Sequence, residues 1–324
     1  GPQSRGLGDV YKRQTDSSPM LLVHDISFAE SAEELRRRCS IGELLAIDGG
    51  GAASPYEQAL ARFDGDNGGR ADLTHDDVIT IMYTSGTTGL PKGAMVTHGM
   101  NVWNSINLGI PAGIGIDTVD LNVLPLFHTG GLNCYCKPVL HAGGTVVILK
   151  TFDPGETLQV LGDPAQGITH FFAVPAPYQF MMQHPDFELT DLSRLRIAGV
   201  GGAPCALTIL QNWYERGVSI MQGYGMTETS PACIFLDPGD ALRKIGSTGK
   251  VLLHTEARIV NDDGGDCGPD EIGELWVAGP NITPGYWNRP DATADAFEGR
   301  WLKTGDAARV DDEGFIYIVD RWKD

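Results

Sequence analysis

The sequence Tyr83-Thr-Ser-Gly-Thr-Thr-Gly-Leu-Pro-Lys-Gly93 continues directly from 78–83, an apolar and β-branched run with the composition of a buried strand. Small residues in such a turn let backbone N–H groups approach a ligand closely. Backbone amides and hydroxyl groups can bind phosphate oxygens, and Lys92 can add a positive charge. The stretch therefore predicts a strand that ends in a phosphate-binding loop. Its hydroxyl residues are Thr84, Ser85, Thr87 and Thr88.

The loop differs from the Walker A loop of P-loop NTPases. A Walker A loop has two glycines separated by four residues, then Lys and Ser or Thr, and a helix immediately afterwards. Here only two residues separate Gly86 from Gly89, Pro91 precedes Lys92, and Gly93 follows the lysine. The chain is therefore not a P-loop NTPase. By itself the loop also fits an ordinary Gly/Thr hairpin turn. Other parts of the sequence are needed to distinguish a phosphate-binding loop from such a turn.

Strands and helices alternate on both sides of the loop. Strands are predicted at 20–24, 41–47, 78–83, 94–97, 119–124, 145–149, 169–174, 195–198 and 218–221. Helices are predicted at 31–38 with Ser31 as N-cap, and at 55–62, 98–108, 177–184 and 207–216. This order is typical of a layered α/β/α domain with a mostly parallel sheet, which we place at residues 20–240.

The pattern changes after about residue 240. Short alternating strands are predicted at 256–260, 273–278 and 315–319, separated by Gly/Asp turns. They predict a small antiparallel β-barrel-like subdomain at 241–320. At the other end, 6–14 resembles translated adapter sequence, so residues 1–19 are expected to be a disordered, non-native leader.

Composition excludes several classes of partner. Of the 324 residues 42% are hydrophobic, and the formal net charge of −18 argues against nucleic acid or an anionic membrane. No apolar run approaches the roughly 18 residues that span a bilayer, and the start has no signal-peptide core. The six cysteines form no C-x-x-C pair, which is typical of reduced thiols and predicts a cytoplasmic protein. The oligomeric state stays open.

Further sequence blocks follow the loop in a fixed order. Together with it they resemble the adenylate-forming superfamily of acyl-CoA synthetases, nonribosomal peptide synthetase adenylation domains and luciferases, most of all its fatty- or aryl-acid CoA ligases. The resemblance covers residues 20–324 and implies that 321–324 begins a hinge to a C-terminal domain that the chain lacks. The blocks are Leu124-Pro-Leu-Phe-His-Thr-Gly-Gly-Leu132, Gly201-Gly-Ala-Pro204, Gln222-Gly-Tyr-Gly-Met-Thr-Glu-Thr229, Gly273-Glu-Leu-Trp-Val-Ala-Gly279, Pro284-Gly-Tyr-Trp-Asn288, Trp301-Leu-Lys-Thr-Gly-Asp306 and Asp320-Arg-Trp-Lys-Asp324.

The resemblance implies an ATP (AMP) site built from these blocks. Tyr224 would stack on adenine, and the acceptor-only carboxylate of Asp306 would bind the ribose hydroxyls with Arg321 nearby. Taken singly, a tyrosine such as Tyr224 is more often a core aromatic, and an aspartate after a glycine, such as Asp306, is more often a turn residue. The nucleotide-binding residues implied are Thr84, Ser85, Gly86, Thr87, Thr88, Gly89, Lys92, Gly201, Gly202, Ala203, Pro204, Gln222, Gly223, Tyr224, Gly225, Met226, Thr227, Asp306 and Arg321.

Catalytic and metal-binding roles follow from the same resemblance. Thr227 would hydrogen-bond the α-phosphate and Lys92 would neutralise phosphate charge. Glu228 is the expected carboxylate ligand of Mg²⁺, with the hydroxyl of Thr84 as a second candidate. His128 completes the expected catalytic set as the aromatic gate of the acyl site, although a lone histidine is also often a hydrogen-bonded core residue.

The residues around His128 predict the class of acid. Amino-acid-activating members of the superfamily carry Asp at this place, to pair with the substrate ammonium group. Residues 127–131 contain no carboxylate, and an unpaired buried ammonium costs several kcal/mol. The small residues 129–131 leave room for an acyl chain or ring. The expected substrate is therefore a fatty or aryl acid.

Three functions remain open at this point. The first is an acyl-CoA synthetase, which forms acyl-AMP from ATP and transfers the acyl group to CoA. The second is an acyl-AMP ligase or luciferase-like member with another acceptor, and persistent adenylation without CoA turnover would favour it. The third is a nucleotide-binding module without catalysis, which would bind ATP without carboxylate-dependent pyrophosphate release. Since the expected C-terminal domain is missing, we expect this chain to bind nucleotide weakly and to turn over little.

Overall fold

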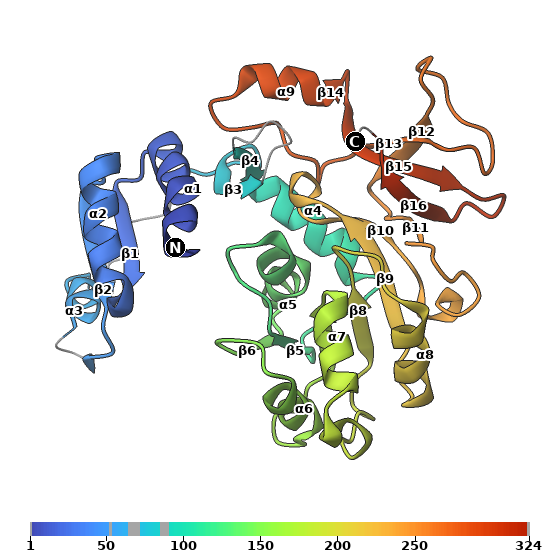
Figure 1. Ribbon diagram of the computed structural model, residues 1–324, viewed down its shortest axis with the longest axis horizontal. Helices are drawn as coiled ribbons and strands as arrows, with labels where there is room; N and C mark the ends of the chain where they lie inside the picture. Colours follow the sequence, from blue (N-terminus) through green and yellow to red (C-terminus); the bar gives the residue numbers. More distant parts are fainter. Residues whose placement is uncertain (1, 52–53, 64–71, 85–90, 323–324) are drawn as a thin grey trace. The chain divides into compact units, whose positions relative to one another are not determined.

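The computed structural model describes the chain except for residues 1, 52–53, 64–71, 85–90 and 323–324, and for 2–9 it describes the backbone only. The chain divides into two compact units, which are described separately. The first consists of Gly1–Thr74 and Tyr83–Gly93, and the second of His75–Met82 and Ala94–Asp324. Figure 1 labels most of the helices and strands of both units.

The first unit contains a two-stranded parallel sheet. Strand β1 (Leu21–Asp25) pairs with β2 (Glu43–Ile47), and α2 (Ala29–Cys39) connects them. A short helix, α3 (Pro55–Ala61), follows β2 and is capped by the hydroxyl of Ser54. The alternation of strand and helix in this region is as predicted.

Two predictions for the first unit are wrong. Residues 1–19 were expected to be disordered, but α1 spans Pro2–Ser17. The reason is packing, since Val10 and Tyr11 contact the small core formed by Leu35, Cys39 and Ile41. Ser31 is not an N-cap either, because α2 begins at Ala29, after a 3-10 turn that spans Ile26–Phe28.

The centre of the second unit is a seven-stranded sheet with the order β11-β10-β9-β8-β7-β5-β6. Strands β5 to β9 are parallel to one another, β10 is antiparallel to β9, and β11 is antiparallel to β10. The sheet includes β11, so it extends beyond residue 240, where the α/β part was expected to end. The strand bounds are β5 (Val119–Asn122), β6 (Thr145–Ile148), β7 (His170–Ala173), β8 (Ile197–Val200), β9 (Ile220–Gly225), β10 (Ala232–Phe235) and β11 (Lys250–Val251).

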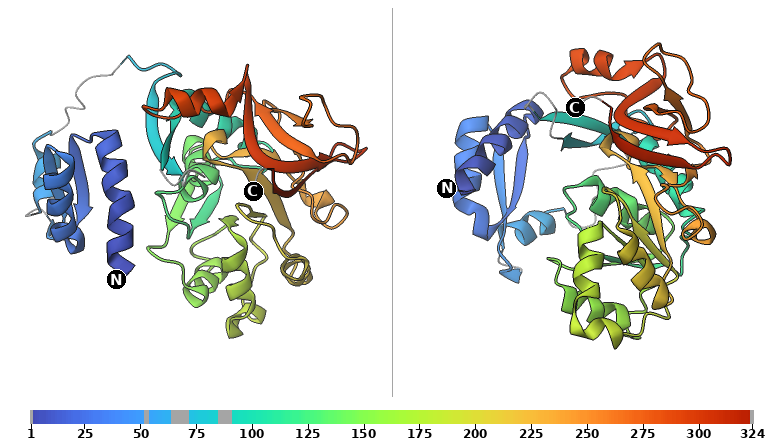
Figure 2. Two further views of the ribbon diagram at one scale, coloured as in Figure 1. Left: turned by 45° about the horizontal axis from the view of Figure 1, so that its top comes forward. Right: turned by 45° about the vertical axis from the view of Figure 1, so that its right-hand side comes forward.

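Two hydrophobic cores lie on opposite faces of this sheet. Phe171, Ala198 and Ile220 pack against α6 (Pro154–Gly162), α7 (Pro175–Met182) and α8 (Leu207–Glu215). The neighbouring residues Phe172, Ile197 and Met221 belong to the second core, with α4 (His98–Gly109) and α5 (Cys136–His141). Successive strand residues point to opposite faces, so helices cover both sides of the sheet (Figure 2). The predicted α/β/α layering is confirmed.

A hairpin carries the predicted phosphate loop. Strands β3 (Val78–Thr84) and β4 (Lys92–Thr97) pair in a two-stranded sheet. The hydroxyl of Thr97 accepts a hydrogen bond from the backbone N–H of Met100 and so caps α4. Strand β4 therefore runs from the loop directly into a helix of the second core.

The last part of the chain forms a curled antiparallel sheet, as predicted. Its order is β12-β13-β15-β14, and β16 pairs with residues 306–310 of β15, on the same edge that β14 pairs with at 301–302. A short helix, α9 (Pro290–Ala296), precedes β14. The strand bounds are β12 (Glu256–Val260), β13 (Gly273–Ala278), β14 (Phe297–Glu298), β15 (Trp301–Val310) and β16 (Ile316–Arg321).

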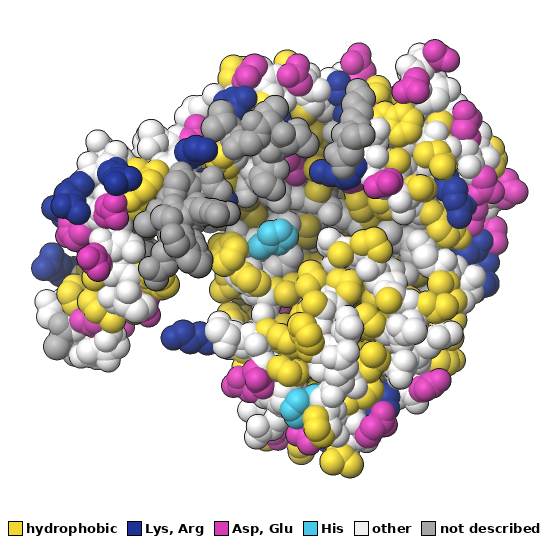
Figure 3. All heavy atoms as spheres, viewed as in Figure 1, with side chains coloured by type: hydrophobic (Ala, Val, Ile, Leu, Met, Phe, Trp, Pro, Cys, Tyr) yellow, Lys and Arg dark blue, Asp and Glu magenta, His cyan; other side chains and the backbone are white. Residues whose placement is uncertain are grey.

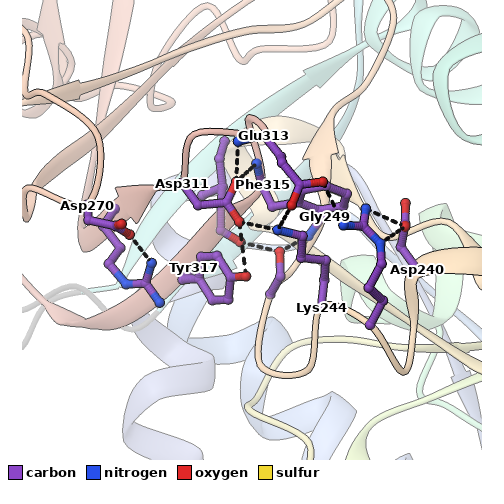
Figure 4. Close-up of polar contacts among 12 residues, drawn as sticks. Asp240, Lys244, Gly249, Asp270, Asp311, Glu313, Phe315 and Tyr317 are labelled. Atoms are coloured by element: carbon purple, nitrogen blue, oxygen red, sulfur yellow. Dashed lines mark hydrogen bonds and ion pairs between the residues drawn. The ribbon is translucent and has the colours of Figure 1, made fainter.

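Charged residues fix the turn between β15 and β16. The ammonium of Lys244 lies 2.7 Å from a carboxylate oxygen of Asp311 and 2.6 Å from one of Glu313 (Figure 4). Arg243 pairs with Glu313 and also with Asp240. The loop after β10 is thereby joined to the far end of the antiparallel sheet.

Exposed hydrophobic side chains gather on one part of the surface of the second unit. Hydrophobic side chains gather in Figure 3 over the region of α5, α7 and α8. The exposed hydrophobic residues of these helices include Leu140, Phe180 and Tyr214. Among the described residues, no helix has the length and apolar character needed to cross a bilayer. All six cysteines lie in the described part of the chain and are free thiols.

Candidate active site

Tyr224 and Asp306 come from different sheets and meet through a short hydrogen bond. The phenol of Tyr224, on β9, donates to Oδ2 of Asp306, on β15, at 2.5 Å. Nη1 of Arg321 lies 2.5 Å from Oδ1 of the same carboxylate. Burial raises the pKa of Tyr224, and the negative charge of Asp306 raises it further, so the phenol stays protonated and acts as the donor. Asp306 is therefore in direct contact with two other predicted nucleotide-binding residues, Tyr224 and Arg321.

The strand register and a left-handed glycine position Asp306. Asp306 is opposite Arg321 in the pairing of β15 with β16. The preceding Gly305 has φ of +74°, a conformation that favours glycine, and its N–H donates to Oε1 of Glu274 at 3.1 Å. The N–H of Asp306 donates to the hydroxyl of Thr304. No role was predicted for Glu274, which lies in the Gly273–Gly279 block. In the structure its carboxylate helps to hold the backbone at Gly305.

The predicted adenine turn lies beside the strand that carries Tyr224. Strands β8 and β9 are parallel with Val200 opposite Gln222, so the turn that starts at Gly201 lies next to the end of β9. A Cβ on Gly201 would lie 3.1 Å from the carbonyl oxygen of Gly223. A larger residue at 201 would require the two segments to shift by a few tenths of an ångström. The next residue, Gly202, has φ of +77°, a conformation that favours glycine. The structure thus brings the 201–204 and 222–225 blocks together.

The end of β9 is closed tightly by the next segment. A Cβ on Gly225 would lie 1.8 Å from the carbonyl oxygen of Pro231, so this position accepts glycine alone. The side-chain amide of Gln222 donates to the carbonyl of Ser247 at 3.3 Å, so this side chain is hydrogen-bonded within the protein. Met226 packs against the core of the antiparallel sheet. These neighbours of Tyr224 shape the site through packing.

Thr227 and Glu228 lie in a buried 3-10 turn, Thr227–Thr229. Only 4% of Glu228 is exposed. One of its carboxylate oxygens, Oε1, accepts a hydrogen bond from the phenol of Tyr286 at 2.8 Å, and its carbonyl oxygen accepts one from the N–H of Thr283, also at 2.8 Å. The partners Thr283 and Tyr286 belong to the region of the Pro284–Asn288 block, for which the sequence had predicted no role.

A buried amide holds the end of the same turn. The side-chain nitrogen of Asn281 donates to the carbonyl oxygens of Thr229 and Ala232, each at 3.1 Å. Its oxygen accepts from the hydroxyl of Thr255, which in turn accepts from Asn107 on α4. Asn281 was missed in the sequence, because a polar residue in a loop gives no sign of its burial.

The residues around Glu228 can be compared with the needs of Mg²⁺. Within the described residues there is no group of three or more His, Cys, Asp or Glu side chains that could hold a metal ion. Mg²⁺ commonly uses one or two carboxylates together with substrate phosphates and water. A single buried carboxylate beside a hydroxyl-bearing residue, Thr227, fits that requirement. The arrangement is compatible with a metal held jointly by protein and nucleotide.

The phosphate-loop residues belong mainly to the first unit. Thr84 ends β3 and Lys92 begins β4, and the Thr84 hydroxyl donates to the Lys92 carbonyl oxygen at 3.5 Å. The other predicted loop residues, Ser85, Gly86, Thr87, Thr88 and Gly89, lie outside the described residues. The contribution of this loop to the site stays a prediction.

His128 is exposed, which excludes the alternative of a hydrogen-bonded core histidine. Its Nδ1 accepts a hydrogen bond from the N–H of Gly130 at 3.0 Å. The next residues form a short π-helix, Gly130–Cys134, a distortion that often occurs at functional sites. A Cβ on Gly131 would lie 2.3 Å from the carbonyl oxygen of Pro125, so the turn requires a glycine.

Comparisons with known proteins show which family the chain is similar to. Residues 10–287 match the family described as AMP-binding enzyme. The chain is 37% identical over 321 residues to feruloyl-CoA synthase of Amycolatopsis sp, and 35% identical over 325 residues to indoleacetate–CoA ligase of Aromatoleum aromaticum. These alignments cover 98% and 100% of this chain but 62% of each relative, so the chain spans less than two thirds of their length.

A solved structure gives the same result. O-succinylbenzoate coenzyme A synthetase from Bacillus subtilis, in complex with AMP, is 31% identical and superposes with a TM-score of 0.81. The superposition covers 97% of this chain and 61% of that one. This chain belongs to the AMP-binding enzyme family.

Proposed function

We propose that the chain is the nucleotide- and acid-binding part of an aryl-acid CoA ligase, which activates a carboxylic acid with MgATP and passes the acyl group to CoA. Both curated relatives are named for acids that carry an aromatic ring. The structural relative is described in complex with AMP. These likenesses favour an aryl acid over the fatty acid that the sequence left equally open.

The observation that carries the proposal is the group Tyr224, Asp306 and Arg321. Asp306 presents two acceptor oxygens in a nearly buried position, 9% exposed, and suits a pair of ribose hydroxyls. Tyr224 carries an aromatic ring on the 222–225 segment, whose backbone lies beside the turn at Gly201 and Gly202. A flat base can be held between such a ring and a backbone without side chains.

The first chemical step would occur at the α-phosphorus of ATP. A carboxylate is a poor electrophile, so its oxygen attacks the phosphorus and displaces pyrophosphate, and acyl-AMP forms. Thr227 would donate a hydrogen bond to the α-phosphate, and Lys92 would offset phosphate charge. Glu228 would hold Mg²⁺, which neutralises charge on the phosphates when it is bound. Positioning and charge neutralisation supply most of the catalysis in transfers of this kind.

The acyl side would discriminate by charge. Residues 127–131 carry no carboxylate that could pair with an ammonium group. His128, exposed and held by Gly130, would lie at the entrance for the acid. An amino acid would leave its ammonium without a partner, at a cost of several kcal/mol if buried, whereas a neutral aromatic ring would not.

The experiment is an assay of pyrophosphate release. It compares the 324-residue chain with a chimera that continues Asp324 with the C-terminal part of feruloyl-CoA synthase. We expect the chimera to release pyrophosphate with aromatic acids and to form the thioester when CoA is added, and the shorter chain to be much slower. Release that depends on amino acids, or adenylation that CoA never discharges in the chimera, would contradict the proposal.

A further inference from the structure

Tyr286 contacts the residue proposed to hold the metal. Its phenolic O–H donates to Oε1 of Glu228 at 2.8 Å, although the two residues are 58 positions apart in the sequence. We propose that Tyr286 is a positioning residue, which fixes the Glu228 carboxylate in the orientation that receives Mg²⁺ with the nucleotide. The inference rests on the proposed function, since it concerns how this chain binds MgATP.

The backbone around Tyr286 is tied to two parts of the site. The N–H of Thr283 donates to the carbonyl of Glu228, and the hydroxyl of Thr283 donates to the carbonyl of Met95 on β4 at 2.7 Å. The N–H of Met95 donates to the carbonyl of Gly285 at 3.0 Å, and Ala94 forms a bridge with Tyr286. Residues 283–286 therefore connect the Glu228 turn to the strand that leaves the predicted phosphate loop.

The segment is also held from its other side. The N–H of Tyr286 donates to the hydroxyl of Thr293 at 2.9 Å, and that hydroxyl donates to the carbonyl of Arg289. Gly285 has φ of +142°, and a Cβ there would lie 2.4 Å from the side chain of Thr293. The backbone position of Tyr286 is thus determined without its phenolic oxygen. Loss of the O–H should leave the fold in place.

The hydrogen bond has a defined consequence for ligand binding. A carboxylate that is free to rotate must lose that freedom when it binds a metal, whereas one held by a neighbouring donor is already oriented. The effect should therefore appear in the part of nucleotide affinity that depends on Mg²⁺. It should not appear in the binding of adenine and ribose, the roles proposed for Tyr224 and Asp306.

The test measures the affinity of the 324-residue chain for ATP with MgCl₂ and with EDTA, and for AMP with EDTA, by calorimetric titration. In Tyr286→Phe we expect the gain in ATP affinity from Mg²⁺ to fall about tenfold, the factor that 1.4 kcal/mol represents. AMP affinity in EDTA should remain that of the unmodified chain, and urea unfolding should remain one cooperative transition, with its midpoint lowered by no more than the loss of one hydrogen bond to a buried carboxylate explains. Glu228→Gln should remove the Mg²⁺ gain, and adding Tyr286→Phe to it should cause no further loss.

A matched control removes a phenolic O–H that donates to a different carboxylate. The phenol of Tyr317 donates to Oδ2 of Asp311 at 3.3 Å, in the β15–β16 turn region (Figure 4). Tyr317→Phe should leave the Mg²⁺ gain unchanged.

The possible results separate the two proposals. If the unmodified chain binds neither AMP nor ATP, or gains nothing from Mg²⁺, the proposed function fails. If Glu228→Gln loses the gain while Tyr286→Phe keeps it, the positioning role alone is contradicted. A loss of AMP affinity in EDTA equal to the loss for MgATP would also overturn it, because it would indicate a general structural effect.

Discussion

The phenol of Tyr224 and the carboxylate of Asp306 form a hydrogen bond of 2.5 Å, which joins the end of the parallel part of one sheet to a long strand of the other. Arg321 pairs with the second oxygen of the same carboxylate. Both oxygens are thus engaged, and a ribose that binds here must share or replace these partners. The proposed nucleotide site and this contact between the two sheets of the second unit depend on the same residue, Asp306.

Asp306→Asn should weaken AMP binding by about tenfold or more. Hydrogen bonds to a charged group contribute about 1.5–3 kcal/mol, and the amide replaces one acceptor oxygen with a donor. Titration calorimetry with AMP and with 2′,3′-dideoxy-AMP provides the measurement. The dideoxy nucleotide lacks both hydroxyls, so the unmodified chain and the variant should bind it with similar affinity. An equal loss for both nucleotides would show that Asp306 does not contact the ribose.

Gly225→Ala should destabilise the protein by about 1–3 kcal/mol or more, the usual cost of overpacking. The added Cβ would lie within 1.8 Å of the Pro231 carbonyl oxygen. Urea unfolding measures the change in the free energy of unfolding. Gly217→Ala is the control, since it has φ of +80° but no atom within 4 Å of the added Cβ, and should show backbone strain alone. Equal losses in the two variants would contradict the close packing at Gly225.

The buried carboxyl of Asp120 should make stability depend on pH. Burial raises its pKa from 3.8 to about 8, and Oδ1 has no hydrogen-bond partner among the described residues. The folded state therefore binds the proton more tightly than the unfolded state. Stability attributable to this group is unaffected below pH 4 and falls as the pH rises from about 4 to about 8, by up to about 1.4 kcal/mol per pH unit.

Asp120→Asn should remove that dependence. The free energy of unfolding of the variant, measured with urea at pH 5, 6, 7 and 8, should rise relative to the unmodified chain at each step. A constant difference across this range would show that Asp120 has the same pKa in the folded and unfolded states.

The ion pair between Lys244 and Asp311 should make stability depend on pH in the opposite direction. Burial by itself would raise the pKa of Asp311, but the hydrogen bonds from Lys244 and from the N–H groups of Phe315 and Glu313 lower it to about 2. Its stabilising contribution is present above pH 4 and is lost as the pH falls toward 2. Lys244→Met should therefore lower the urea midpoint more at pH 7 than at pH 2.5. An equal effect at both values would exclude the ion pair as the cause.

Local patterns in the sequence predicted much of this fold. The strands β12 and β13 begin and end where alternation and flanking turns had placed them, and α4, α7 and α8 lie within a few residues of their predicted ranges. The phosphate-loop hairpin was visible from one apolar run and its small-residue turn. Such features depend on neighbours in the sequence, so they can be read from it.

Other features depend on contacts between distant residues. Strand β15 was missed because Gly305 and Asp306 suggest a turn, whereas pairing with β13 and β16 keeps this segment extended. Helix α1 forms where the resemblance of 6–14 to adapter sequence had suggested a disordered leader. The Tyr286–Glu228 hydrogen bond has no sequence signal at all. The resemblance to the family grouped Tyr224, Asp306 and Arg321 as nucleotide-binding residues. Only the structure shows that Tyr224 and Arg321 both contact the carboxylate of Asp306.

The most direct measurement compares two non-hydrolysable acyl-AMP analogues, feruloyl- and leucyl-sulfamoyl adenosine, in competition with AMP for the 324-residue chain. They share the adenosine and differ in the acid, so one titration tests whether the chain holds a nucleotide beside a site for an uncharged acid. We expect both to displace AMP and the feruloyl analogue to bind at least about tenfold more tightly, since the leucyl ammonium has no carboxylate partner. Equal or tighter binding of the leucyl analogue, or failure of both to displace AMP, would contradict the account.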